Sequence, residues 1–278
     1  MSQKNKRYET EWSFSFTDLR DRIGKMVEDW NEEVEVIKTD FSDSLGDKTE
    51  ATVKLALPLG KSTVTALEND ENLIEATVTH PVGEAITFTP ATSPENVVEL
   101  ESKSENAVNN LRGKREHAVG LTPHIPLTID ARTGAGQTRF DLSRLQLARV
   151  DFRIGAGETQ IDLPTADEAY NVQVKCGAGE TRINIAENTA VNVNVKGGVG
   201  SVVLGVPANA ALRIKAQIGM GGLDIPAALE RLSGQRVMFT EKGVWVSEGF
   251  EDAAHPITVI FKGGVGNFEI KETETTIV

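Results

Sequence analysis

The chain has 278 residues, a formal net charge of −12 and a single cysteine. So acidic a chain is a poor match for nucleic acid or an anionic membrane surface, and we expect neither as a partner. It has no run of about 20 apolar residues, so we expect no membrane-spanning helix. The first residues lack the apolar core of a signal peptide, and the lone Cys176 has no intrachain disulfide partner. Together these features predict a cytoplasmic protein.

Residues 1–34 are predicted to form a polar tail followed by an amphipathic helix with Thr17 as its N-cap. Apolar residues recur there at three- and four-residue spacing: Phe16, Leu19, Ile23, Met26, Val27 and Trp30. We expect this helix to cap the open first turn of the fold that follows, where it would cover exposed strand edges. A helix for self-association or partner docking is the alternative.

Residues 35–120 have the alternating pattern of β-strands, interrupted by turns such as the one at 58–60. They are interpreted as degenerate copies of the units that follow, with a break in the polar stretch 101–120. Residues 121–272 carry the regular repeat. A pair of glycines, G-x-G, recurs there with steps of 21, 22, 21, 21 and 45 residues. The pairs are Gly134 and Gly136, Gly155 and Gly157, Gly177 and Gly179, Gly198 and Gly200, Gly219 and Gly221, and Gly264 and Gly266.

A fixed period of this length is typical of stacked supersecondary units. Four positions keep an apolar residue in every repeat: five and three residues before the first glycine, and one and six residues after it. In the repeat at Gly155 these positions hold Val150, Phe152, Ala156 and Ile161. We expect all four to face inward, because counterparts stack at about 4.8 Å when identical turns lie on one another.

A turn of 21 residues has a perimeter near 70 Å, at about 3.3 Å per strand residue. The sequence therefore predicts an all-β fold, a single-stranded β-helix (β-solenoid) in which glycine permits the sharp turns. Residues 227–233 are expected to form a short helix inserted before the last turn, which would account for the 45-residue step. Residues 273–278 form a polar tail.

One outward position, two residues before the first glycine, is basic in most repeats. It holds Arg132, Arg153, Lys175, Lys196 and Lys262. A stack of cations repels itself, so we expect Glu158 and Glu180 to offset part of it across the turn. The basic column is interpreted as a solvated face, with an anion-binding or partner-binding strip as the alternative.

No catalytic, cofactor-binding or metal-binding constellation is recognisable. The Gly60-Lys61-Ser62 stretch lacks the upstream glycine and the following helix of a phosphate loop. Likewise, the G-x-G pairs lack the third glycine and helix of a dinucleotide site. The four histidines are scattered, and Cys176 is expected to be a buried, unreactive thiol. We therefore predict a protein that is not an enzyme and needs no cofactor.

The repeated G-A-G-E-T pattern of residues 154–163 and 176–185, closed by 261–266, resembles the toastrack family. This family includes the DUF4097 adhesin-type domains and the LiaF-like C-terminal domains. The resemblance covers about residues 40–272. It implies a single-stranded β-helix that acts by binding and is linked to sensing of bacterial envelope stress, and it supplies no catalytic residues.

Three functional hypotheses follow. The first is a rigid scaffold that binds a partner protein along its faces or ends. The second is a bactofilin-like structural polymer, in which self-association uses the ends of the coil or the N-terminal helix. The third is an adhesin or carbohydrate-binding surface, which would require exposed aromatic residues and paired carboxylates.

Overall fold

The computed structural model describes residues 35–68, 71–103, 113–237 and 239–273. Within these ranges all regular structure is β-strand except one 3-10 turn, η1 (Phe250–Asp252). The all-β prediction is therefore confirmed. The predicted N-terminal helix and the C-terminal tail after 273 lie outside the described residues.

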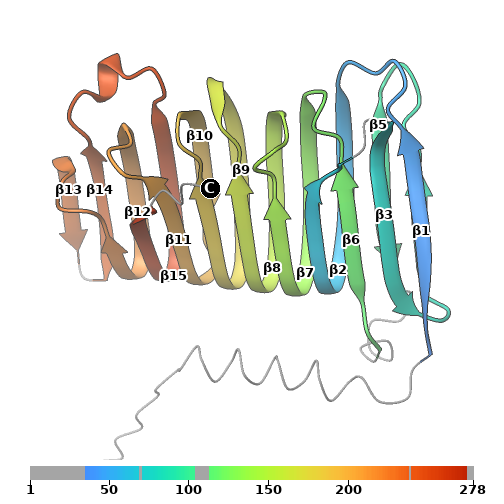
Figure 1. Cartoon of the computed structure of the whole chain (residues 1–278). Helices are drawn as coiled ribbons and strands as arrows, with labels where there is room; N and C mark the ends of the chain where they lie inside the picture. The colour runs from blue at the N-terminus through green and yellow to red at the C-terminus, as the bar shows by residue number, and fades with distance from the viewer. Residues whose placement is uncertain (1–34, 69–70, 104–112, 238, 274–278) are drawn as a thin grey trace, which may run out of the picture.

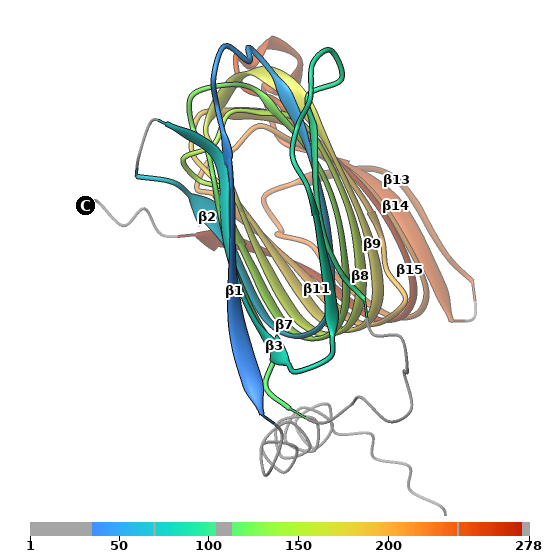
Figure 2. The ribbon, with the colours of Figure 1, turned by 90° about the vertical axis from the view of Figure 1, so that its right-hand side faces the viewer.

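All the strands belong to one 15-stranded sheet. In chain order they are β1 (Val36–Ser44), β2 (Ala51–Ala66), β3 (Asn72–Pro81), β4 (Ala85–Thr89), β5 (Val97–Lys103), β6 (Glu116–Leu121), β7 (Leu127–Asp141), β8 (Leu147–Leu163), β9 (Ala166–Ile185), β10 (Thr189–Lys196), β11 (Val199–Pro207), β12 (Leu212–Asp224), β13 (Glu230–Val237), β14 (Thr240–Val246) and β15 (Ile257–Thr273). Figure 2 shows the long strands nested one behind another around a common interior.

Successive repeats pair in parallel, and each residue lies opposite its counterpart. Ala156 on β8 pairs with Ala135 on β7 and with Ala178 on β9, and the glycines pair in the same way. The long strands run through the G-x-G position and bend there. These bends line up along one edge of the molecule, which is the lower edge in Figure 1.

Three of the four predicted inward positions are buried, two before the bend and one after it. Val150, Phe152 and Ile161 are at most 1 % exposed. The rings of Phe140 and Phe152 stack with centroids 4.2 Å apart, as do those of Phe261 and Phe268. The narrow interior is thus filled by one side chain from each turn in each column.

The prediction was wrong at the position one residue after the first glycine, where the side chains point outward. The second glycine of each pair has a positive φ, for example 120° at Gly157 and 136° at Gly200. The alternation breaks between the buried Ile154 and the outward Ala156, on either side of the first glycine, and Thr159 and Ile161, four and six residues after that glycine, face inward. The outward residues form a line that we call the corner ridge: Leu59, Ala135, Ala156, Ala178, Val199, Val265 and Met220.

The order of the last turns also differs from the chain order. β15 was expected to be the final turn, yet it lies between β11 and β12, pairing in parallel with both. The chain therefore passes β12, makes the β13–β14 hairpin and returns to fill the gap. Residues 256–273 supply an interior turn rather than an end.

The helix predicted at 227–233 is not present. Leu229 closes a turn by donating its N–H to the Pro226 carbonyl, and β13 begins at Glu230. β13 pairs antiparallel with β14, and β14 pairs with β12. Hydrogen bonding to this open sheet edge outweighs the helical propensity of the short stretch, because propensity is a weak preference that tertiary contacts override.

Candidate functional site: the bend and its flanking columns

The glycines of the bend are required by contact between neighbouring turns. A Cβ added at Gly155 would overlap the Gly134 carbonyl, and one added at Gly157 would overlap the Gly136 carbonyl. The same relation holds along the stack. All twelve predicted turn glycines have the backbone of an adjacent turn within 3 Å of the place a Cβ would occupy. Glycine therefore allows the turns to stack at strand spacing where each turn bends.

The corner ridge changes character along its length. It begins with small or half-buried residues and ends with large exposed ones. Val199 is 52 % exposed, Val265 46 % and Met220 51 %. Beyond Met220, the Thr240 hydroxyl lies 3.5 Å from the Gly219 carbonyl, and the preceding Phe239 is 68 % exposed. Exposed apolar side chains gathered in one line are typical of an interaction surface.

The structure brings the five residues of the basic column together on adjacent strands, from β7 through β8, β9 and β10 to β15. Its first part is neutralised. Arg153 lies 3.1 Å from a carboxylate oxygen of Asp130 and 3.7 Å from one of Asp151. The expected compensation by Glu158 and Glu180 is absent from the described ion pairs, and Glu180 instead pairs with Arg182 at 3.2 Å.

The second part of the column is not neutralised. Lys175, Lys196 and Lys262 are exposed, and in the described parts of the chain none of them makes an ion pair. Two further exposed lysines follow on β12 and β14. We call these five residues the lysine patch: Lys175, Lys196, Lys262, Lys215 and Lys242.

A second group of polar residues is buried inside the first turns. Arg115 Nε lies 2.7 Å from a carboxylate oxygen of Glu84, and the side chains are 3 % and 1 % exposed. Ser102 donates to the other Glu84 oxygen at 2.7 Å, and the Ser62 hydroxyl lies 3.1 Å from His117 Nδ1. A serine, a histidine and a glutamate could suggest a hydrolase, but Ser62 is only 3 % exposed. The group is therefore interpreted as structural.

Sequence reasoning missed this group. Ser62 and His117 are far apart in the chain and meet only because β2 pairs with β6. Glu84 comes from the turn between β3 and β4 and contacts Arg115 and Ser102. No spacing in the sequence signals such an arrangement, because it depends on strand pairing.

His117 makes the stability of the fold dependent on pH. Burial lowers its pKa from 6.5 to about 4; Glu84 opposes this shift, whereas Arg115 and His80 add to it. Since the folded pKa lies below the unfolded one, the stabilisation is complete above pH 6.5 and is lost as pH falls toward 4. We expect the free energy of unfolding to drop by about 3 kcal/mol over this window, at 1.36 kcal/mol per pKa unit.

Urea denaturation at pH 7, 5.5 and 4 measures this effect. His117→Gln should flatten the pH dependence between 6.5 and 4, because the amide does not titrate. An equally steep loss in that variant would contradict the assignment to His117.

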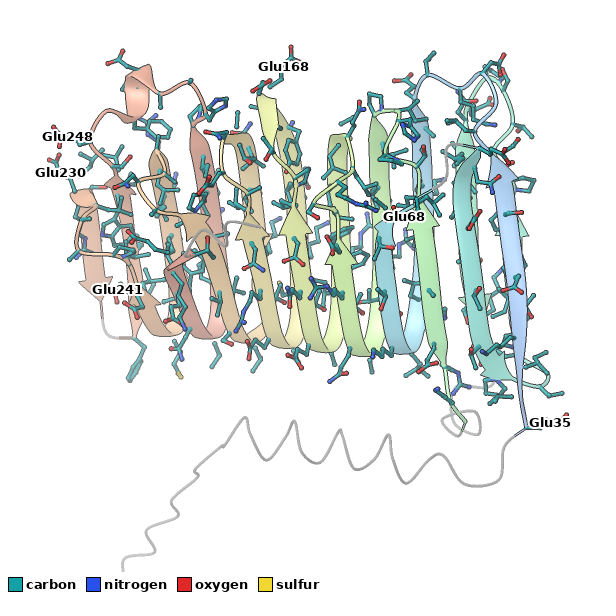
Figure 3. All side chains as sticks on the ribbon, viewed as in Figure 1. Glu35, Glu68, Glu168, Glu230, Glu241 and Glu248 are labelled. Atoms are coloured by element: carbon teal, nitrogen blue, oxygen red, sulfur yellow. The ribbon has the colours of Figure 1, made fainter. Side chains whose placement is uncertain are left out.

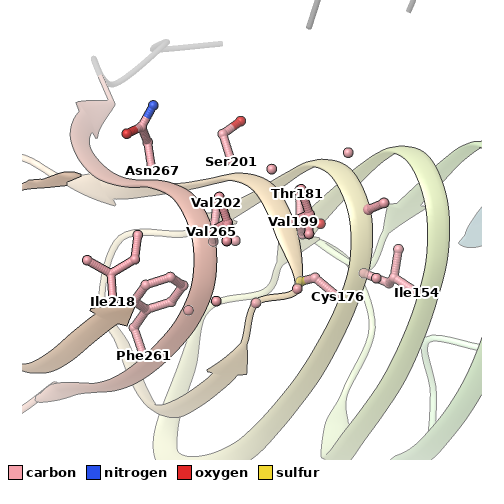
Figure 4. A pocket seen from close by; sticks show the side chains of 18 of the residues that line it. Ile154, Cys176, Thr181, Val199, Ser201, Val202, Ile218, Phe261, Val265 and Asn267 are labelled. Carbon is pink, nitrogen blue, oxygen red and sulfur yellow. The ribbon is translucent and has the colours of Figure 1, made fainter. Parts of the chain in front are cut away.

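The lone thiol faces a small void inside the bend. Gly197 and Gly263 carry no side chain there, and Ile154, Cys176, Ile218 and Phe261 line a space of about 20 Å³ (Figure 4). This volume is close to that of a single water-sized probe and leaves no room for an organic ligand. Burial raises the pKa of the Cys176 thiol, and the opposing hydrogen bond with Thr181 is a smaller influence. Such a thiol is a poor nucleophile at neutral pH.

Over the described ranges, no three His, Cys, Asp or Glu side chains gather as a metal site would require. Nor is any helix in these ranges long and apolar enough to cross a membrane.

The fold and its exposed columns define a class of protein: a repetitive all-β coil whose distinctive surface is its bend. The family model for the N-terminal domain of toast_rack, DUF2154, matches residues 26–184, more than half of the chain. The chain belongs to the toast-rack family, as the sequence resemblance indicated.

One solved structure supports the fold. The crystal structure of a "putative cell adhesion protein" from Clostridium sporogenes has a TM-score of 0.56 at 18 % identity, covering 86 % of this chain and 100 % of that one. A "putative adhesin" from Bacteroides fragilis has a TM-score of 0.35 at 11 % identity, covering 87 % and 99 %. No curated protein matches the sequence. At 18 % identity, the similarity to the Clostridium sporogenes protein concerns the fold alone.

Proposed function

We propose that this protein is a non-enzymatic β-solenoid that binds an acidic segment of a partner protein on its lysine patch. The observation that supports this proposal is the uncompensated charge of Lys175, Lys196 and Lys262 on a chain whose net charge is −12. Two residues before each of these lysines on its strand stand Gln173, Asn194 and Ile260, which are uncharged. Like charges opposite one another on neighbouring strands repel, and an acidic ligand would relieve this repulsion.

The patch suits a short acidic segment better than a long polyanion. Salt screens charges beyond about 8 Å at physiological ionic strength, so a local patch attracts an anion within that distance. A nucleic acid or membrane would extend over the acidic remainder of the surface and be repelled. The exposed valines and methionine of the adjacent corner ridge would make apolar contacts with the same segment.

Binding by a surface also fits the cell-adhesion description of the Clostridium sporogenes protein with the same fold. A role in envelope-stress sensing stays an expectation from the family resemblance. Polymerisation stays an alternative. Its ends would meet through β1 and β13, strands that carry charged residues such as Lys38, Asp40 and Glu230, which disfavour edge-to-edge pairing.

The test measures binding of poly-L-glutamate to the full chain by calorimetry at several salt concentrations. Reversing Lys175, Lys196 and Lys262 to Glu should weaken binding at least about tenfold and reduce its salt dependence, since charge pairs are lost. The control reverses Lys61, Arg139 and Arg182 beyond the bend, which changes the net charge equally. Equal loss in both variants, or none in the first, would contradict the proposal.

A further inference from the structure

Four residues of the lysine patch lie in one line that runs across the strands. Lys175 on β9 pairs with Lys196 on β10, which pairs with Lys262 on β15. The line continues through Gln217 on β12 to Lys242 on β14. The corner ridge of the same turns lies three positions further along the chain, on the other side of the first glycine. A basic line and an apolar line therefore follow the bend side by side.

The spacing of the lysines matches a helix better than an extended segment. Neighbouring strands are about 4.8 Å apart, so Lys175 to Lys262 spans about 10 Å and Lys175 to Lys242 about 19 Å. Three side chains on one face of an extended segment span about 13 Å, at about 3.3 Å per residue. On an α-helix, residues i, i+3 and i+7 share a face and span about 10.5 Å, and residue i+14 follows at about 21 Å.

The two adjacent lines also favour a helix. The apolar line consists of Val199, Val265 and Met220, each about half exposed. Successive side chains of an extended segment point to opposite faces, so such a segment cannot turn an acidic and an apolar stripe toward neighbouring lines. On a helix, successive residues lie about 100° apart, and two different stripes can run next to each other. An amphipathic helix thus fits both lines at once.

The residues around these lines leave the lysines accessible to an acidic ligand. Glu241 precedes Lys242 on β14, but it pairs with the buried Ile218 and so faces the opposite side of the sheet. The positions two residues beyond the ridge on β11, β15 and β12 are uncharged: Ser201, Asn267 and Gly222. Figure 3 places three exposed acidic residues at the upper edge and at the β13–β14 end, away from the bend: Glu168, Glu230 and Glu248.

We propose that the acidic segment bound by this protein is an amphipathic α-helix of a partner protein, lying along the bend from β9 to β14. Acidic residues at i, i+3 and i+7 contact Lys175, Lys196 and Lys262, and a fourth at i+14 contacts Lys242. Apolar residues beside them cover Met220 and the valines of the ridge. This helix rests on the proposed function and adds the conformation, length and residue pattern of the acidic segment.

Two fluorescent peptides of about 18 residues test the helix, since shorter ones are marginally helical in water. The helix-spaced peptide carries Glu at i, i+3, i+7 and i+14, each followed by Leu, in an Ala-rich background. The alternating peptide has the same composition with Glu at every second position. In fluorescence anisotropy with the full chain, the helix-spaced peptide should bind at least about fivefold more tightly.

Reversing Lys175, Lys196 and Lys262 to Glu should remove this advantage. The charge-matched control should retain it: reversal of Lys61, Arg139 and Arg182. Equal affinities for the two peptides, both lost in the first variant, would overturn the helix and leave the acidic partner standing. Failure of both peptides while poly-L-glutamate binds would also overturn the helix. If poly-L-glutamate fails as well, the proposed function falls with it.

A substitution at the far end of the line tests the register. Lys242→Gln should weaken the helix-spaced peptide about threefold, as expected for loss of one exposed charge pair. It should leave unchanged the affinity of a helix-spaced peptide that carries Gln at i+14, because only the fourth acid reaches β14. An equal effect on both peptides would contradict the proposed register.

Discussion

Gly157→Ala is expected to prevent stable folding. Its φ of 120° is a conformation that L-residues rarely adopt, and the new methyl would overlap the Gly136 carbonyl on the neighbouring turn. Backbone strain alone costs about 1–3 kcal/mol. Separating the turns to relieve the overlap would also break parallel hydrogen bonds, so we expect a total above about 4 kcal/mol, in the exceptional range for one substitution. Urea denaturation followed by circular dichroism measures it.

Substitutions at two other glycines distinguish backbone strain from overlap with the neighbouring turn. Gly46 has a φ of 56° and nothing within 4 Å of its virtual Cβ, so Gly46→Ala should cost only the strain of a left-handed residue, about 1–2 kcal/mol. Gly197 lies one residue before the glycine pair Gly198 and Gly200. A Cβ added there would lie 3.4 Å from the Phe261 ring, which is an ordinary contact. Gly197→Ala should therefore change stability by less than about 1 kcal/mol. Equal losses of stability in Gly157→Ala and Gly197→Ala would refute the role of the paired glycines in stacking the turns.

The second large effect is expected at the buried ion pair. In the native protein, Arg115 Nε lies 2.7 Å from a carboxylate oxygen of the buried Glu84. Arg115→Met removes this cation and leaves the carboxylate buried beside Ser102. Breaking a buried pair by removing one partner costs about 3–5 kcal/mol, because the remaining charge stays desolvated. The free energy of unfolding at pH 7 should fall by that amount.

Adding Glu84→Gln to this variant should recover much of the loss, since the amide oxygen still accepts from Ser102 and no charge remains buried. Arg144→Met is the matched control. Arg144 pairs with Glu68 at 2.6 Å, but the side chains are 56 % and 84 % exposed. Water and salt screen such an exposed pair, so Arg144→Met should change the free energy of unfolding far less than Arg115→Met. A double variant no more stable than Arg115→Met would argue against a charge effect.

The surface positions show which structural features can be predicted from the period of the sequence. The register of Arg132 through Lys262 followed from the sequence, because identical turns place counterparts side by side. The direction of Ala156 and its counterparts did not. The bend at the glycine pair shifts the alternation by one residue, and the apolar character of the ridge resembled that of a core position.

The amino-acid sequence by itself determined the all-β class, the repeat length, the residues that stack and the need for glycine at each bend. These properties are local or recur along the chain, so comparing the repeats with one another is enough to find them. Only the tertiary structure decided that β15 enters between β11 and β12, that residues 230–237 pair as a strand, and that Glu84 meets Arg115. Corresponding positions are chemically alike in every turn, so one repeat can pair with several others. The whole fold determines which strand edge stays open and which strand pairs with it.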